Sequence, residues 1–294
     1  MANQHVTATL EARDLEAIDR VVYEPRKEEL VARSVLNVNT SIHPGAETYA
    51  YNVMTRSGVA KIIANGADDL PLVDMDLKRY HQPIYTIAAG IRYSIQEIRQ
   101  SQLTGQPVDA LKAETARRAI AEKENNLVFV GDEKVGIKGA ANAEGIQVVN
   151  SDKTWKDMTS DEIIEQVRLA RMNITVLPGY GGAQLALLLP PWQFEELTRR
   201  YSDFDARSLR EVIAGKNLFT SIERVPDLAK IGTQGTDSLI IMDTSPSTCE
   251  ILLPMDAVRL QEEYAYPNWK VPFEERCGGC ILRAPYAVVR VDGI

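Results

Sequence analysis

The sequence of 294 residues has few of the side chains that build disulfides and metal sites. It contains three cysteines and three histidines, and aromatic residues make up 6% of it. So few cysteines suit a reducing compartment. Cys277 and Cys280 have the CxxC spacing of zinc and redox sites, but a zinc site needs about four ligands, and all the histidines lie in the first third of the chain. Because the pair precedes a strand-like run, we expect ordinary strand residues here.

Long apolar runs and an excess of basic residues are also missing. No run approaches the roughly 18 to 20 residues that cross a bilayer, and the first residues lack the basic start and apolar stretch of a secretory signal. We therefore expect a protein that is made in the cytoplasm and has no membrane partner. The net charge is −8, whereas a protein that grips nucleic acid by neutralising phosphates normally shows a basic surface.

Motifs of catalysis are lacking as well. The glycine-rich residues 179–182 have no Lys-Ser/Thr behind them to hold phosphate and metal, so a loop is expected. An acidic cluster could offer carboxylates to a cation such as calcium, although its spacing does not match an EF-hand and a solvated loop is the simpler interpretation. This cluster consists of Asp68, Asp69, Asp74 and Asp76. No catalytic, cofactor-binding or metal-binding residue is predicted, and whether the acidic cluster binds a cation stays open.

The first 36 residues are rich in charges of both signs and carry one apolar stripe at helical spacing. Leu15, Ile18 and Val22 belong to this stripe. It can dock on the core of its own subunit or on a neighbouring subunit, and the residues do not separate these alternatives.

Residues 47–64 predict a β-hairpin. Tyr49 and Tyr51 belong to an alternating run, residues 55–58 supply a turn, and residues 59–63 can return. Few large apolar residues are available to cover both faces, and an isolated two-stranded ribbon is marginal in water. We therefore expect this ribbon to be supported from outside itself.

The clearest strand covers residues 85–95, where apolar side chains alternate along one face. A capping-box spacing at Ser94–Glu97 turns it directly into a helix. Residues 107–130 predict the longest helix of the chain, and the small side chains of Ala116 and Ala119 indicate close packing against a sheet.

The region after about residue 150 alternates between helices and strands, which is typical of an α/β layer structure. The predicted elements are a helix that starts at the capping box Thr159–Glu162 and reaches about Met172, a strand at 174–177, a strand at 183–189, a helix from Pro190 to about Tyr201, a helix at 209–214, strands at 239–242 and 249–253, and a last strand at 287–291.

Several segments, in their order and spacing, resemble one family. They are Gly45-Ala-Glu-Thr-Tyr-Ala-Tyr51, Ala67-Asp-Asp-Leu-Pro-Leu-Val-Asp-Met-Asp76, Tyr93-Ser-Ile-Gln-Glu97, Ala119-Ile-Ala-Glu-Lys-Glu-Asn-Asn126, Phe129-Val-Gly-Asp132, Gly136-Ile-Lys-Gly-Ala-Ala-Asn142, Val271-Pro272, Gly278-Gly279, Ala284-Pro-Tyr-Ala287 and Val291-Asp-Gly-Ile294. No single segment is as specific as a metal signature, but together they span nearly the whole chain from about residue 10. The chain resembles the major capsid proteins of tailed bacteriophages and prophages.

This resemblance implies the mixed α+β (α/β) fold of tailed-phage shells, which encapsulins and the herpesvirus capsid floor share. The implied parts are an N-terminal arm at 1–36, an extended β-hairpin loop at 37–83, a peripheral domain at 84–149 and 261–294 with its spine helix at 107–130, and an axial domain at 150–260.

The resemblance also implies a structural function without catalysis. The chain is expected to form pentamers and hexamers of an icosahedral virion shell that encloses double-stranded DNA and assembles in the host cytoplasm. Its implied partners are other copies of itself, with scaffolding, portal and decoration proteins. An encapsulin shell around a cargo enzyme and an oligomeric α/β enzyme are the alternatives. An enzyme would need a pocket with converging polar groups.

The residues expected at subunit contacts lie in the arm, the ribbon and the glycine-rich loop. They are Leu15, Ile18, Val22, Tyr49, Tyr51, Arg56, Lys61, Gly179 and Gly181. Some relatives link subunits covalently through lysine and asparagine side chains. Lys61 would be the lysine here, but no acid/base partner can be named, so a crosslink is not expected. No long segment precedes the arm, so a fused scaffolding domain is not expected either.

The charge balance generates a first prediction. Because the net charge is −8, phosphate neutralisation cannot drive assembly, and the protein should form shells without nucleic acid. Adding nuclease during assembly should leave the yield of particles in sedimentation unchanged. A strict requirement for nucleic acid would contradict this prediction.

Overall fold

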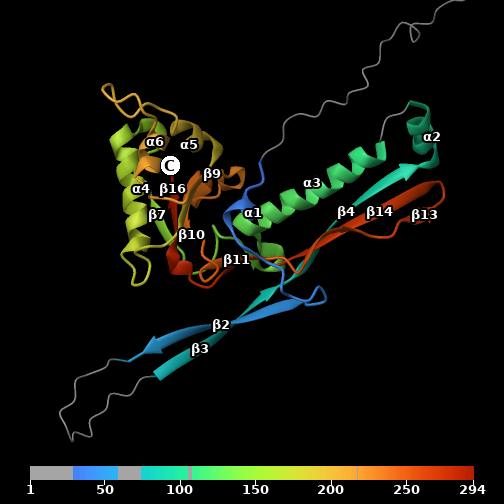
Figure 1. Cartoon of the computed structure of the whole chain (residues 1–294), viewed down its shortest axis with the longest axis horizontal. Coiled ribbons are helices and arrows are strands. Elements are labelled where there is room, and N and C mark those ends of the chain that lie inside the picture. Colours follow the sequence, from blue (N-terminus) through green and yellow to red (C-terminus); the bar gives the residue numbers. More distant parts are fainter. Residues whose placement is uncertain (1–28, 59–73, 105–107, 217) are drawn as a thin grey trace, which may run out of the picture.

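The computed structural model describes residues 29–58, 74–104, 108–216 and 218–294. They form an α/β part, a long helix beside an elongated sheet, and a projecting two-stranded ribbon (Figure 1). The helices are α1 (Ala32–Val35), α2 (Ile95–Thr104), α3 (Val108–Phe129), α4 (Ser160–Thr175), α5 (Pro191–Glu196) and α6 (Leu209–Gly215). The strands are β1 (Val38–Asn39), β2 (Thr48–Ser57), β3 (Asp74–Pro83), β4 (Tyr85–Ser94), β5 (Gly131–Asp132), β6 (Ile137–Lys138), β7 (Gln147–Asn150), β8 (Leu185–Leu189), β9 (Ser221–Arg224), β10 (Ser238–Asp243), β11 (Cys249–Leu252), β12 (Met255–Arg259), β13 (Glu263–Ala265), β14 (Asn268–Cys277), β15 (Gly279–Leu282) and β16 (Val288–Asp292). Within these residues, every helix is too short or too polar to cross a membrane.

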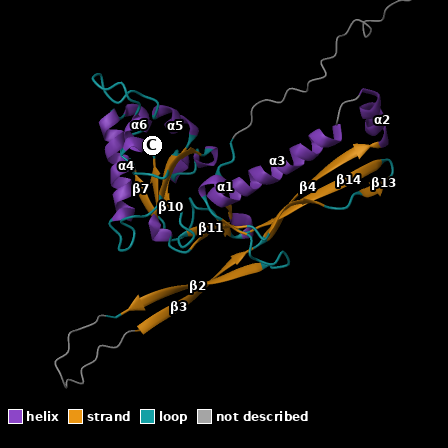
Figure 2. Cartoon of the chain, viewed as in Figure 1, coloured by secondary structure: helices purple, strands orange, loops and turns teal. Residues whose placement is uncertain are grey.

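A five-stranded sheet in the order β7-β16-β10-β8-β9 forms the centre of the α/β part. Every residue of β8 and β10 is buried. Leu187 and Ile241 face a core that α4 and α6 cover, whereas Leu188 and Ile240 face the end of α3 and the segment around α1. Because both faces are covered, these strands can be continuously apolar. Figure 2 shows the helices α4, α5 and α6 around this sheet.

The long helix α3 lies along the sheet that β4 and β14 form. These two strands pair antiparallel over ten residues, and β12 and β13 pair with the other edge of β14. Ala116 and Ile120 of α3 are buried against Tyr93 and Phe273, so the predicted packing of this helix against a sheet is confirmed. Ala119 is exposed instead, because it lies to one side of the face that Ala116 and Ile120 form.

Both predicted capping boxes are confirmed. Ser94 and Glu97 exchange two hydrogen bonds at the start of α2, and Thr159 and Glu162 do so at the start of α4. Each box satisfies backbone N–H groups that have no partner within the helix. Sequence motifs of this kind therefore fix where a helix begins.

The prediction of a strand at 174–177 is wrong. Helix α4 continues to Thr175, and Ile174 is buried on the same helix face as Val167 and Ala170. This helical spacing of buried residues outweighs the strand preference of the β-branched side chains. Helix α5 also ends earlier than predicted, at Glu196.

The predicted turn of the hairpin is wrong as well. Thr55 and Ser57 lie in β2, opposite Asp76 and Asp74 of β3. The strand that pairs with β2 is therefore 74–83. The predicted partner, 59–63, lies outside the described residues. The acidic side chains of β3 favour a loop by composition, and this hides its pairing.

The last strand, β16, lies between β7 and β10 in the five-stranded sheet, whereas β14 pairs with β4. Residues 261–294 thus contribute to both sheets. The division into peripheral and axial domains stays a prediction.

The contact between β15 and the end of α3 generates a second prediction. Gly279 has a φ of +72°, and an added Cβ would lie 2.7 Å from Cγ2 of Ile137 and 3.3 Å from the carbonyl oxygen of Leu127. Gly136 has a φ of +74° with no such neighbour. Gly136→Ala should lower the unfolding free energy by about 1 kcal/mol through backbone strain, and Gly279→Ala by about 2–4 kcal/mol because overpacking adds to that strain. Denaturant unfolding of free subunits measures both, and equal losses would contradict the close approach.

Candidate intersubunit site

The ribbon of β2 and β3 consists of ten antiparallel pairs, from Thr48 opposite Pro83 to Ser57 opposite Asp74. It projects from the rest of the described chain, with no helix beside it (Figure 2). Side chains alternate between the two faces of a strand. Tyr51 and Tyr80 therefore share one face, and the pairs next to them point the other way.

The base of the ribbon is anchored to its own subunit. Nε2 of Gln82 donates to the carbonyl oxygen of Gly278 at 2.7 Å, and Arg276 donates to that of Pro44 at 2.6 Å. Tyr49 and Tyr51 pack against a small core of buried residues. These core residues are Ile84, Leu252 and Ile281.

The two tyrosines predicted at subunit contacts thus lie half-buried on their own subunit. Tyr51 stacks on Tyr80, with ring centroids 5.6 Å apart. Burial and the neighbouring Tyr80 raise the pKa of Tyr51. These rings therefore stabilise the root of the ribbon within the subunit, whether or not they also touch a neighbour.

The outer half of the ribbon exposes three large apolar side chains on one face. Met54 lies opposite Leu77, and Met75 follows on the same face; the three side chains are 42%, 56% and 62% exposed. The predicted contact residue Arg56 occupies β2 opposite Met75. Burying a side chain such as leucine or methionine contributes about 1.5–3 kcal/mol, so a neighbouring subunit that covered this face would stabilise the contact.

Met54, Met75 and Leu77 are missing from the sequence prediction. Met75 and Leu77 alternate with charged residues, which is the period of a half-buried strand. The acidic cluster around them favours a solvated loop and conceals this period. Of that cluster, Asp74 and Asp76 lie on β3, and the other two aspartates are outside the described residues.

The remaining predicted residues divide into two groups. Leu15, Ile18, Val22 and Lys61 lie outside the described residues. Gly179 and Gly181 occupy the loop after α4, where an added Cβ would meet no atom within 4 Å. This loop borders a polar hollow of about 870 Å³ that the turn at 243–247 closes from the other side. The prediction that the glycine-rich stretch is a loop is confirmed.

The cysteines are strand residues, as predicted. Cys277 ends β14 and Cys280 lies in β15; both are buried and free, as is Cys249. Burial raises the pKa of Cys277 and of Cys280 to about 12. Their thiols stay protonated at neutral pH and are poor nucleophiles. Across the described residues, the histidine, cysteine and acidic side chains form no group that could hold a metal ion.

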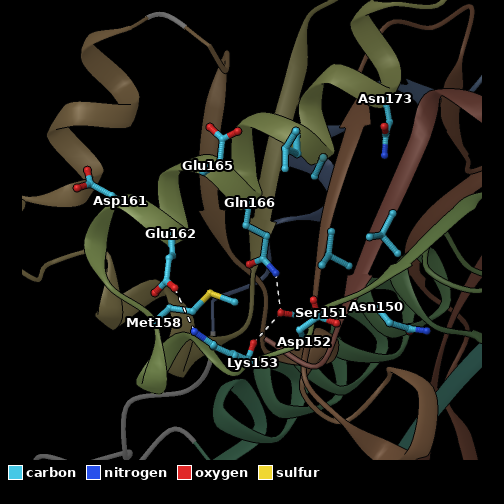
Figure 3. Close-up of a pocket in the computed structure, with 14 residues that line it drawn as sticks. Asn150, Ser151, Asp152, Lys153, Met158, Asp161, Glu162, Glu165, Gln166 and Asn173 are labelled. Atoms are coloured by element: carbon cyan, nitrogen blue, oxygen red, sulfur yellow. Dashed lines mark hydrogen bonds and ion pairs between the residues drawn. The ribbon is translucent and has the colours of Figure 1, made fainter.

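A groove of about 690 Å³ runs between α4 and the segment that follows β7 (Figure 3). Its polar side chains hold local structure. Gln166 accepts from Nε1 of Trp155 at 2.6 Å and donates to Oγ of Ser151 at 2.7 Å. The backbone at the start of α4 and then Lys153 lower the pKa of Glu162 to about 2. No histidine or cysteine lines the groove. The hydroxyl of Ser151 donates to the carbonyl oxygen of Lys153, and the amine of Lys153 pairs with Glu162.

The comparison with known families gives the chain its class. The model of the major capsid protein family matches residues 58–294, and the chain therefore belongs to this family. It is a structural shell subunit of the virion capsid, which associates with other copies of itself, and not an enzyme.

Similar proteins include both viral and cellular shells. The chain is 22% identical over 260 residues to the type 1 encapsulin shell protein of Myxococcus xanthus (strain DK1622), covering 86% of this chain and 84% of that protein. The capsid of Myoviridae phage XM1 has the same fold, with a TM-score of 0.82, 12% identity and coverage of 98% of this chain and 100% of that one. A virus-like particle from Pyrococcus furiosus has a TM-score of 0.63, with 15% identity and coverage of 89% and 92%. The predicted tailed-phage capsid fold is thus confirmed, and encapsulins share it.

The ribbon generates a third prediction. In free subunits, backbone amides of 53–57 and 74–78 should exchange hydrogen rapidly, since a two-stranded ribbon is marginal in water. Amides of 49–51 and 80–82 should exchange more slowly because the base is anchored. In assembled shells the outer half should become protected, while α3 stays protected in both states. Equal protection of the outer half in both states would show that the ribbon needs no neighbour.

Proposed function

We propose that the chain forms pentamers and hexamers that close into an icosahedral shell around the double-stranded DNA of a tailed phage, and that this occurs in the host cytoplasm. The observation that carries the proposal is the match to the major capsid protein family over residues 58–294. The exposed apolar face of the ribbon supports it, since a neighbouring subunit can supply the missing cover.

The parts of the subunit fit this role. We assign residues 1–36 to an arm, 37–83 to the extended loop, 84–149 with 261–294 to the peripheral domain, and 150–260 to the axial domain. The projecting ribbon, the long helix α3 and the α/β part support this division (Figure 1). Heterologous contacts between such subunits can close into rings and shells.

Enclosure of DNA in this proposal is containment. A net charge of −8 opposes attraction to phosphates, so another component must drive the genome inside. Scaffolding, portal and decoration proteins are the partners that such a shell would use.

An encapsulin shell around a cargo enzyme is the second candidate. The similarity to the Myxococcus xanthus shell protein over 86% of the chain favours it. The fold does not separate the two functions, because phage capsids and the encapsulin relative share it. The contents of particles purified from the source cell distinguish the two functions. Packaged DNA supports the phage capsid, and an enzyme cargo supports the encapsulin.

Electron microscopy and sedimentation of the expressed protein, with its phage partners, provide the fourth prediction. Closed particles should form. Leu77→Ser should reduce their yield about tenfold or more, because the ribbon face loses an apolar side chain that a neighbouring subunit would bury. Circular dichroism should still show a folded subunit. Leu77→Met keeps an apolar side chain at the same position and should assemble like wild type.

Two results would contradict this proposal. A wild-type protein that stays monomeric or dimeric in light scattering, even with its partners, would rule out a shell. Normal assembly of Leu77→Ser would leave the shell intact but remove the ribbon face from its contacts.

A further inference from the structure

One guanidinium faces three carboxylates where α1 meets the long helix. Arg33 makes two short hydrogen bonds to Glu124, from Nε to Oε1 at 2.8 Å and from Nη2 to Oε2 at 2.7 Å. The same Nη2 lies 3.0 Å from Oδ1 of Asp256 and 3.4 Å from Oε2 of Glu275. The cluster thus joins α1, α3, β12 and β14.

Two of the three carboxyl groups in this cluster are almost fully buried, which is unusual for side chains that can carry a charge. The side chains of Glu124 and Glu275 are only 3% and 1% exposed, whereas Asp256 is 68% exposed. Oε1 of Glu275 has no hydrogen-bond partner. Two buried carboxylates that share a single cation cannot both ionise without a large desolvation penalty.

The groups that act most strongly on Glu275 lie on α1, α3 and β12. Burial, and then the negative charge of Glu124 on α3, raise the pKa of Glu275 to about 8, against the opposing effect of Arg33 on α1. Asp256 on β12 raises it further, and Cys277 on its own strand is a buried neutral thiol. From β4 the register partner of Glu275 is Ile87, which carries no charge. The carboxyl group therefore holds a proton at neutral pH.

The segment that this cluster holds, residues 31–36, lies between the long helix α3 and the five-stranded sheet. The backbone N–H groups of Val31 and Ala32 donate to Oδ1 of Asn125 on α3, at 3.2 and 3.0 Å. Val31, Ala32 and Leu36 are also buried in the core shared with β8 and β10. Figure 1 shows α1 where the α/β part meets α3. Residues 31–36 therefore connect the long helix to the five-stranded sheet.

We propose that Arg33, Glu124 and Glu275 form a proton-dependent clasp that fastens residues 31–36 across this junction and opens when Glu275 loses its proton. Loss of the proton leaves two buried negative charges on one guanidinium, while Asp256 adds a third nearby. The shell should then weaken in alkaline solution, a consequence that rests on the proposed function.

The sign follows from proton linkage. The pKa of Glu275 is raised above its ordinary value of 4.5, so its contribution to stability is fully present below that value. The contribution is lost progressively as the pH rises and is gone above about 8. Arg33 lowers the pKa of Asp256, so the stabilisation from Asp256 is lost only under acidic conditions, outside this window. One proton corresponds to about a tenfold rise in the unfolding equilibrium constant per pH unit.

Free subunits provide the direct test. Between pH 5.5 and 7.5 the unfolding equilibrium constant of wild type should rise with pH, and the Glu275 proton should account for about a tenfold rise per pH unit. Glu275→Gln should lack this part of the rise, because the amide carries no proton to lose. Glu274→Gln, on the opposite face of the same strand, should behave like wild type. Glu124→Gln removes the neighbouring negative charge and should also flatten the dependence, which covers the case that Glu275→Gln does not fold.

Two further readouts separate a clasp from a general effect on stability. The infrared band of a protonated carboxyl should disappear near pH 8 in wild type and be absent from Glu275→Gln. Cleavage by trypsin after Arg33 should accelerate from pH 7 to pH 9 in wild type, relative to Glu275→Gln. A wild-type pH dependence in Glu275→Gln would show that Glu275 holds no such proton. Equal cleavage of both proteins would show that the junction does not open, and either result overturns the proposal.

Particles test the link to assembly separately. Wild-type shells should release subunits as the pH rises toward 9, and Glu275→Gln shells should persist. Failure of wild type to form particles at any pH would overturn the proposed function, while the measurements on free subunits would still decide the clasp.

Discussion

The burial of β8 and β10 on both faces holds the described subunit together. One face is covered by helices that are close in sequence, α4 and α6, while the other requires α1 and the end of α3. Each leucine buried here contributes about 1.5–3 kcal/mol, so neither cover can be removed without exposing a large apolar surface. This requirement fixes the long helix, and the sheet of β4 and β14 beneath it, to the α/β part.

The ribbon differs from these strands, because the apolar side chains of its outer half are not buried within the subunit. Its base has tyrosines, hydrogen bonds and a small core, but its outer half presents methionine and leucine side chains to solvent. Neighbouring apolar side chains on an exposed surface often mark a site where another protein binds. The apolar surface that a chain leaves uncovered indicates where its neighbours bind, and a shell subunit needs surfaces of this kind.

Sequence patterns predicted the elements whose signals are local. The capping boxes before α2 and α4, the alternation in β4 and the length of α3 all depend on residues within a few positions of one another. The pairing of β2 with β3 depends on partners separated by residues 59–73, and no local pattern specifies it. Strands β12 to β14 were missed for a related reason: Pro272 and the charged residues of β14 conceal its alternation, which becomes apparent only beside α3.

Glu275 shows why the alternation of buried and exposed residues along β14 could not be predicted from the sequence. Val271, Phe273, Glu275 and Cys277 all lie on the buried face of β14, so composition alone would call for an apolar residue where the glutamate stands. An apolar side chain of similar volume would avoid the cost of burying a carboxyl group here. It could not, however, respond to the guanidinium that α1 brings to this point or to the carboxylate on α3. Because Glu275 can ionise, the stability of the contact between the long helix and the α/β part depends on whether this side chain carries a proton.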